Sequence, residues 1–93
     1  MLRIYRVIND SMRPGLTAGD FVIARRRRRP PRAGERVVVD HPNHGVIIKR
    51  VASVASNGNL ICQSDNPAGL SPEQLGPIAQ QRIRGIVCWS IRA

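Results

Sequence analysis

Two side chains in this sequence have the chemistry of a nucleophile and its base, Ser11 and Lys49. A serine hydroxyl is a weak nucleophile until a neighbouring base takes its proton, and a lysine can be that base only when burial lowers its pKa towards neutrality. Lys49 is the one lysine among 15 cationic residues, and the others are arginine, which cannot give up its proton. Taken singly, however, a serine before a methionine or a lysine within a strand is usually an ordinary surface residue.

The segment that carries Lys49 is predicted to bury it. Residues 45–54 are rich in valine and isoleucine and read as a β-strand. The strand period of two puts Lys49 on the same face as Ile47 and Val51, whereas Arg50 points to the other face. A lysine between branched apolar side chains has the environment that a general base requires.

The rest of the chain predicts an all-β fold of short strands. The expected strands cover residues 3–8, 21–24, 36–39, 45–54, 59–63 and 83–91. Turn residues separate them, and Asn57-Gly58 is the strongest hairpin signal. A serine cap at Ser71, followed by Pro72 and Gln74, supports at most one short helical turn.

Length and composition limit the class of protein. Ninety-three residues fit a single domain, expected to cover 1–93, and 42% hydrophobic residues are too many for a disordered chain. No apolar run approaches the ~20 residues of a membrane span, and no secretory leader opens the sequence. We therefore expect a cytoplasmic protein. Cys62 and Cys88 are expected to remain reduced, and with His41 and His44 they match no zinc spacing, so no metal or cofactor is expected.

The formal net charge of +9 points towards nucleic acid, an anionic membrane or an acidic protein as a partner. Five consecutive arginines begin a basic loop at residues 25–32, predicted to be a solvated hairpin connection between the strands at Phe21 and Arg36. The loop is either simply solvated or a patch that binds a partner. Only 3% of residues are aromatic, which disfavours nucleic acid because bases usually stack on aromatic side chains. A peripheral anionic surface stays open.

Three separated motifs carry a resemblance to a known family. They are Ser-Met-Arg-Pro-Gly-Leu at 11–16 leading to Gly19-Asp20, Gly-Glu-Arg-Val-Val-Val at 34–39, and Ile-Ile-Lys-Arg-Val at 47–51. In this order they resemble the serine/lysine peptidases of the signal peptidase I and LexA-type repressor superfamily (families S24 and S26). Ser64-Asp65-Asn66 resembles that superfamily's Gly-Asp-Asn box, and further similarity at 76–78 and 83–87 extends the match over nearly the whole chain.

The resemblance implies a coiled β-sheet half-barrel and a serine protease in which Ser11 attacks and Lys49 is the base. Small soluble members remove the propeptide of nickel-type superoxide dismutase, and this chain looks most like those. The expected substrate is an extended protein segment from which a propeptide or leader is cleaved in trans, because only ten residues precede Ser11. The alternatives are a non-catalytic interaction module of the same fold and a basic binder of nucleic acid or an anionic surface.

The residues around Ser11 carry further expectations. Met12 either packs beneath the nucleophile or lines the substrate cleft, or is a plain core methionine. Asn9 stands where signal peptidases carry an oxyanion-supporting serine. Either its amide or the backbone N–H of Ser11 with another donor would support the oxyanion, or Asn9 has a conformational role in a left-handed backbone.

Three carboxylates near the motifs are expected to be structural. Asp10 should point away from Lys49, because a nearby carboxylate would raise the lysine pKa and oppose its role as base. The family resemblance gives Asp20 and Asp65 counterparts in turns, and we expect both to stabilise backbone amides.

Overall fold

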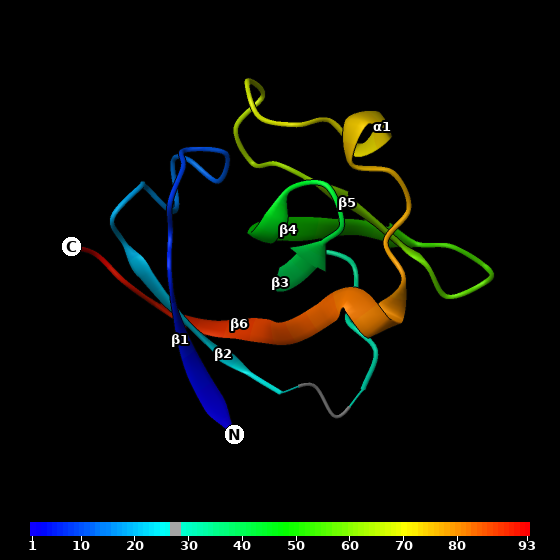
Figure 1. Cartoon of the computed structure of the whole chain (residues 1–93), viewed down its shortest axis with the longest axis horizontal. Helices are drawn as coiled ribbons and strands as arrows, with labels where there is room; N and C mark the ends of the chain where they lie inside the picture. The colour runs from blue at the N-terminus through cyan, green and yellow to red at the C-terminus, as the bar shows by residue number, and fades with distance from the viewer. Residues whose placement is uncertain (27–28) are drawn as a thin grey trace.

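The computed structural model describes residues 1–26 and 29–93, and six strands in this part of the chain form one antiparallel sheet (Figure 1). The strands are β1 (Leu2–Arg6), β2 (Phe21–Arg25), β3 (Arg36–His41), β4 (Gly45–Val54), β5 (Leu60–Gln63) and β6 (Ile83–Ile91). Their order is β1-β2-β6-β3-β4-β5, with β1 and β5 at the two edges. The all-β prediction is confirmed, and the expected strands differ from the observed ones only at their ends.

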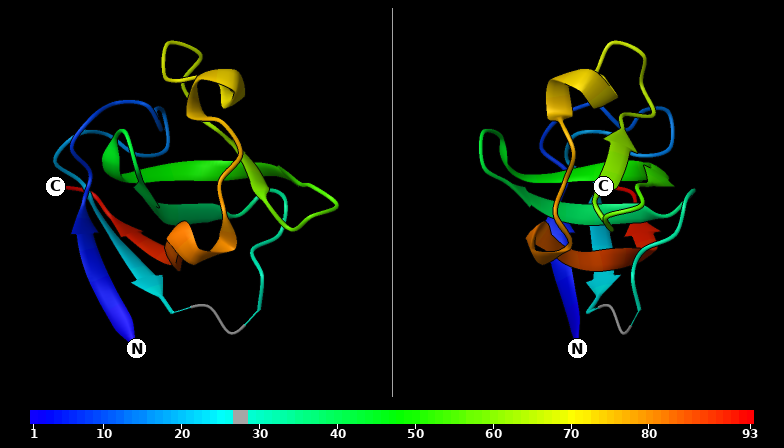
Figure 2. Two further views of the ribbon diagram at one scale, coloured as in Figure 1. Left: turned by 45° about the vertical axis from the view of Figure 1, so that its right-hand side comes forward. Right: turned by 90° about the vertical axis from the view of Figure 1, so that its right-hand side faces the viewer.

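The sheet is strongly coiled and does not close. Figure 2 shows β1 and β2 running steeply across the direction of β3 and β4, with β6 between the two groups. No helix of the described residues is long and apolar enough to cross a membrane.

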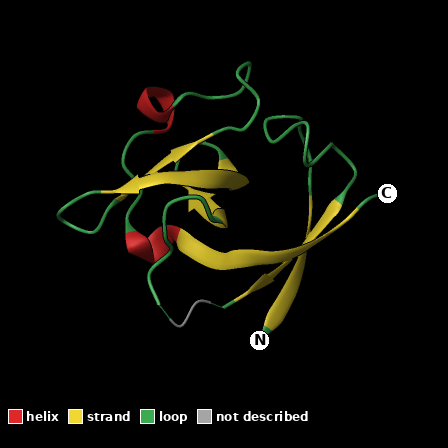
Figure 3. Cartoon of the chain, turned by 180° about the vertical axis from the view of Figure 1, so that it is seen from behind, coloured by secondary structure: helices red, strands yellow, loops and turns green. Residues whose placement is uncertain are grey.

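Short helical turns lie beside the strands (Figure 3). The predicted turn is present as α1 (Pro72–Leu75), and a capping box joins the side chain and backbone of Ser71 to those of Gln74. A second short helical turn, a 3-10 turn at Gln80–Arg82, precedes β6, whereas the sequence predicted at most one. Ala79, which precedes this 3-10 turn, makes no side-chain capping hydrogen bond, so the capping signal that predicted α1 is missing here.

The predicted hairpin at Asn57-Gly58 joins β4 to β5. Gly58 has a φ of 90°, a conformation that favours glycine because it lacks a Cβ. Leu60 then forms a bridge to Ile78, which ties the chain after α1 back to the edge strand β5.

The connection between β2 and β3 is not the predicted hairpin. Strand β6 pairs with β2 on one side and with β3 on the other, so β2 and β3 are not paired with each other. Arg27 and Arg28 lie outside the described residues. Arg29 is not simply solvated, because its guanidinium binds the Glu35 carboxylate at 2.8 and 2.9 Å. This contact holds the pKa of Glu35 at about 2.

The sheet is buried on both faces at its centre. Val37, Val38 and Val39 are each fully buried, although successive residues of a strand point to opposite faces. Val37 and Val39 belong to one core cluster, with Ile47 and Val51, whereas Val38 belongs to a second cluster. The centre of β3 is therefore a continuous apolar run because both faces of the sheet carry a core.

Candidate active site

Ser11 and Lys49 lie in direct contact although 38 residues separate them in the sequence. Ser11 is half-buried in the loop that joins β1 to β2, and Lys49 sits in the middle of β4. The Lys49 Nζ donates a hydrogen bond of 2.5 Å to the Ser11 Oγ. The sheet thus brings together the two residues that the sequence singled out, in the geometry expected of a nucleophile and its base.

The Lys49 side chain is almost completely removed from water, with 2% of its surface exposed. Burial lowers its pKa below the ordinary lysine value, and the charges of Asp65 and Cys62 partly oppose the shift. Cys62 contributes little charge at neutral pH, since its own burial raises the pKa of its thiol to about 11. The predicted face of the strand is confirmed, because Ile47 and Val51, two residues to either side of Lys49, share a core cluster.

Asn66 fixes the loop that carries Ser11. Its backbone N–H donates to the Ser11 carbonyl at 2.8 Å, and its Nδ2 donates to the Asp10 carbonyl at 3.0 Å. These bonds connect the chain after β5 to the backbone on both sides of the Asp10–Ser11 peptide bond. The sequence placed Asn66 in a segment that resembles the Gly-Asp-Asn box of the family, but it did not indicate this contact.

Gly69 packs against the nucleophile from the same side. A Cβ built on Gly69 would lie 2.6 Å from the Ser64 Oγ and 3.1 Å from the Ser11 Cβ, so a larger residue would push this segment away from Ser11. The Ser64 hydroxyl donates to the Leu70 carbonyl at 2.8 Å and closes the segment into a compact loop. No motif predicted the position of Gly69, and its only signal in the sequence was a glycine three residues after Asn66.

A cleft of about 510 Å³ opens above the Ser11–Lys49 pair. Three groups of residues line it beside Ser11 and Lys49: Ile8, Asn9 and Asp10 from the loop after β1, His44 from the turn before β4 with Ile47 from β4, and Asn66, Ala68, Gly69 and Leu70 from the segment after β5. Its lining is largely apolar and includes both Ser11 and Lys49. Such a lining can take apolar groups of a ligand.

Asn9 has a role that the sequence left open. Its Oδ1 accepts a hydrogen bond of 3.0 Å from the Ser11 backbone N–H, so the donor considered for the oxyanion is engaged by the Asn9 side chain. No described residue other than glycine has a positive φ, so the left-handed backbone considered for Asn9 is wrong.

Met12 and Asp10 lie on either side of Ser11 in the sequence and have different surroundings. Met12 is 1% exposed and packs in the second core cluster with Leu16 and Val22. The Asp10 carboxylate accepts from the Ala18 backbone N–H at 3.0 Å and lies 3.8 Å from the Arg13 guanidinium. These contacts direct the charge of Asp10 away from Lys49, as expected.

Asp20 and Asp65 are both structural, but through different partners. Asp20 accepts from the backbone N–H groups of Thr17 and Ala93, which confirms its predicted role and lowers its pKa. Asp65 instead binds the Arg50 guanidinium with two bonds of 2.8 Å, so the expectation of backbone amides was wrong there. Arg50 holds the pKa of Asp65 down and also donates to the Gly34 carbonyl at 2.7 Å.

The histidines and cysteines form no metal-binding group among the described residues. His41 is buried, with its Nε2 2.8 Å from the Leu75 carbonyl oxygen. Cys62 and Cys88 are both free thiols, the first buried and the second exposed.

The family model described as Peptidase S24-like matches residues 2–88. The chain belongs to this family. Its match spans both Ser11 and Lys49, and membership supports a serine peptidase type of activity, although members can be non-catalytic. A comparison with individual curated proteins gave no match.

Proposed function

We propose that this S24-like protein is a serine endopeptidase that uses Ser11 as nucleophile and Lys49 as general base. The observation that carries the proposal is the 2.5 Å contact between Lys49 Nζ and Ser11 Oγ, made by a lysine that is only 2% exposed. An exposed lysine would be charged and could not accept a proton. Burial lowers the pKa of Lys49, which makes the neutral amine accessible nearer to neutral pH.

The first half of the reaction acylates the enzyme. With Lys49 neutral, the Ser11 hydroxyl donates its proton to Nζ while Oγ attacks the carbonyl carbon of the substrate peptide bond. The tetrahedral intermediate then collapses, and the new ammonium of Lys49 donates the proton to the leaving amine. An ester between Ser11 and the N-terminal part of the substrate remains.

The second half frees the enzyme with the same two groups. Lys49, neutral again, takes a proton from a water molecule that attacks the ester carbonyl, and it returns that proton to Ser11 as the acyl group leaves. Because Lys49 is used in both halves, its loss should abolish turnover and not only slow one step.

The oxyanion of each tetrahedral intermediate needs a donor beside Ser11. The Ser11 backbone N–H is a candidate, and it donates to the Asn9 Oδ1. We propose that the substrate carbonyl displaces this oxygen when it enters the cleft. Asn9 is exposed, so rotation of its side chain needs no change in the core.

The substrate proposed is a protein from which a propeptide or leader is removed in trans. The largely apolar lining of the cleft favours apolar side chains next to the cleaved bond, and the family resemblance favours small ones. The sequence resemblance suggests a nickel superoxide dismutase precursor, processed in the cytoplasm, as the first substrate to try.

The test is cleavage by the purified protein of a nickel superoxide dismutase precursor and of a mixture of unbiased peptides, followed by mass spectrometry. Ser11→Ala should abolish every cleavage that the wild type makes. Ser56→Ala, which removes another hydroxyl from an exposed turn, is the matched control and should leave cleavage intact. Cleavage that survives in Ser11→Ala would end the peptidase proposal and favour the non-catalytic module.

A further inference from the structure

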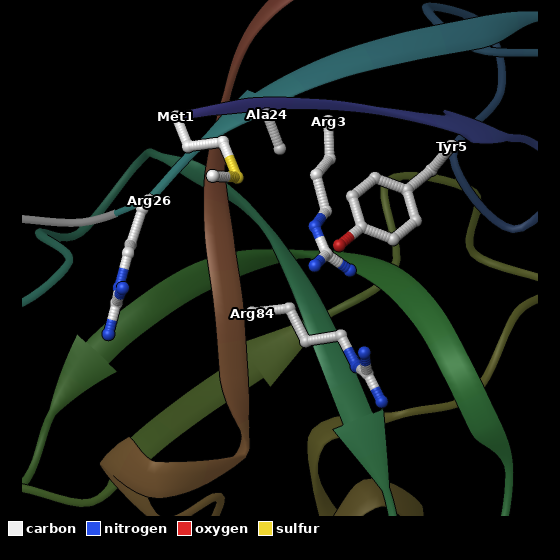
Figure 4. Close-up of a pocket in the computed structure, with 6 residues that line it drawn as sticks. All are labelled: Met1, Arg3, Tyr5, Ala24, Arg26 and Arg84. Carbon is white, nitrogen blue, oxygen red and sulfur yellow. The ribbon is translucent and has the colours of Figure 1, made fainter.

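A second cleft, separate from the one at Ser11, lies beneath β1 and contains a cluster of arginines (Figure 4). It has a volume of about 250 Å³ and is lined by Met1, Arg3, Tyr5, Ala24, Arg26 and Arg84. We call it the arginine pocket. Figure 4 shows the Arg3 guanidinium beside the Tyr5 hydroxyl under β1, with Arg84 extending from β6 into the same space.

The arginine pocket has an excess of positive charge. Arg84 donates from NH2 to the Asp40 carboxylate at 3.0 Å, and its other guanidinium N–H groups stay available. The ion pairs of the described residues use neither Arg3 nor Arg26. Three guanidinium groups and one carboxylate leave a surplus that an anionic ligand would neutralise.

The pocket lies along a free edge of the sheet. Among the described strands, β1 pairs with β2 alone and is an edge strand, so its outer backbone N–H and C=O groups can pair with an added strand. Arg3 and Tyr5 share one face of β1, and a residue placed opposite Arg3 would have its side chain about 5 Å away on that face. A carboxylate there would meet the Arg3 guanidinium.

The same edge leads to the candidate active site. The chain continues from β1 through Ile8 and Asn9, which line the cleft at Ser11. Ser11 follows Arg3 by eight residues, and an extended segment rises about 3.3 Å per residue, so an extended segment that passes Arg3 reaches Ser11 within about eight residues. A single extended substrate can therefore occupy both clefts.

We propose that the arginine pocket binds an acidic stretch of the protein substrate, whose carboxylates contact Arg3 and Arg84 while its cleavage site lies at Ser11. This inference rests on the proposed peptidase function and names the substrate class: a protein with aspartate or glutamate within about eight residues of the cleaved bond. Guanidinium groups bind carboxylates with paired hydrogen bonds, and the Tyr5 hydroxyl adds a donor that a carboxylate accepts. The positive charge of the chain then contributes to substrate selection.

The binding test uses a fluorescein-labelled peptide of ten residues with four glutamates, and the same peptide with glutamines. Anisotropy at low salt gives the Kd for the wild type, for Arg3→Gln/Arg84→Gln and for the control pair Arg82→Gln/Arg92→Gln. Arg82 and Arg92 are exposed and lie outside the pocket lining. Each pair of substitutions removes two positive charges, so the two variants differ in the position of the lost charges and not in their number. Arg3→Gln alone serves as the variant that breaks no ion pair among the described residues.

The pocket pair should weaken binding of the glutamate peptide about tenfold or more, Arg3→Gln about threefold, and the control pair less than about twofold. Equal weakening by the two pairs, or equal binding of the glutamate and glutamine peptides, would overturn the proposal. Tighter binding of a ten-nucleotide oligothymidylate, lost in the pocket pair, would assign the site to nucleic acid and overturn it too.

Cleavage separates this inference from the proposed function. With cleavable versions of the two peptides, the preference is the ratio of kcat/KM for the glutamate peptide to kcat/KM for the glutamine peptide. Arg3→Gln/Arg84→Gln should reduce this ratio about tenfold, and the change should lie in KM and not in kcat. If Ser11→Ala abolishes cleavage but the pocket pair keeps the full preference, the inference alone fails. If cleavage survives in Ser11→Ala, the peptidase proposal fails, and the binding data alone decide whether the pocket recognises acidic peptides.

Discussion

Replacing Lys49 by methionine should abolish cleavage and at the same time stabilise the fold. Methionine fills a similar volume, which suits a position that is 2% exposed. It removes the amine that contacts Ser11 at 2.5 Å and that burial makes costly to charge. Because burial both lowers the pKa of Lys49 and makes its charged form costly, Lys49→Met should lower cleavage activity and raise the free energy of unfolding.

The size of both effects follows from the pKa of Lys49. An exposed lysine with a pKa of ~10.4 is neutral in roughly 1 molecule in 2500 at pH 7, and each unit by which burial lowers the pKa raises that fraction about tenfold. The same unit costs the folded state about 1.4 kcal/mol whenever the lysine is charged. Loss of the base should reduce kcat by about 10²–10⁴-fold.

The sign of the pH dependence is fixed by the direction of the shift. Burial lowers the pKa of Lys49 in the folded protein, so between that value and ~10.4 the unfolded chain binds one more proton than the folded protein. Wild-type stability therefore rises with pH across this window. The advantage of Lys49→Met should be greatest below the folded pKa and should vanish as pH approaches ~10.4.

Two measurements check this reasoning. A pH profile of kcat/KM should rise through a single deprotonation below pH ~10.4, and urea unfolding of wild type and Lys49→Met should differ by about 1.4 kcal/mol for each unit of the shift that the profile reports. Activity of Lys49→Met above a few per cent of wild type would refute the role of Lys49 as base. A pH profile of kcat/KM that rises with an apparent pKa of ~10.4, the value of an exposed lysine, would refute it as well.

Three further changes test the surroundings of the pair. Asp65→Asn removes a charge that raises the pKa of Lys49, so the pH profile should move to lower pH; a shift to higher pH would contradict the electrostatic argument. Asn66→Ala removes the Nδ2 donor to the Asp10 carbonyl and should lower kcat by about tenfold while costing about 1 kcal/mol of stability in urea; Asn57→Ala, in the β4–β5 turn, is the control and should leave kcat unchanged. Titration of the native protein with a thiol reagent should modify Cys88 quickly and Cys62 only on unfolding, because the first is exposed and the second buried; two fast thiols would show that the core around Lys49 opens.

Much of the local structure could be predicted because its signals are local. Alternation of valine and isoleucine located β4 and β6, and the Asn57-Gly58 turn located a hairpin. The 3-10 turn before β6 was missed since it has no side-chain cap. Ser11 and Lys49 were found through the family motif and the chemistry of a lysine among arginines, while their catalytic roles stay predictions.

The sequence alone determined which segments become strands, which face of β4 carries Lys49, and the family pattern around Ser11. These depend on residue period and turn chemistry, which act over a few positions. Only the tertiary structure decided that β6 lies between β2 and β3, because a hairpin and a crossover have the same local signals and differ only in long-range burial. The same packing brought Asn66 and Gly69 against Ser11 and gathered Arg3 and Arg84 into one pocket, contacts between positions that no spacing in the chain connects.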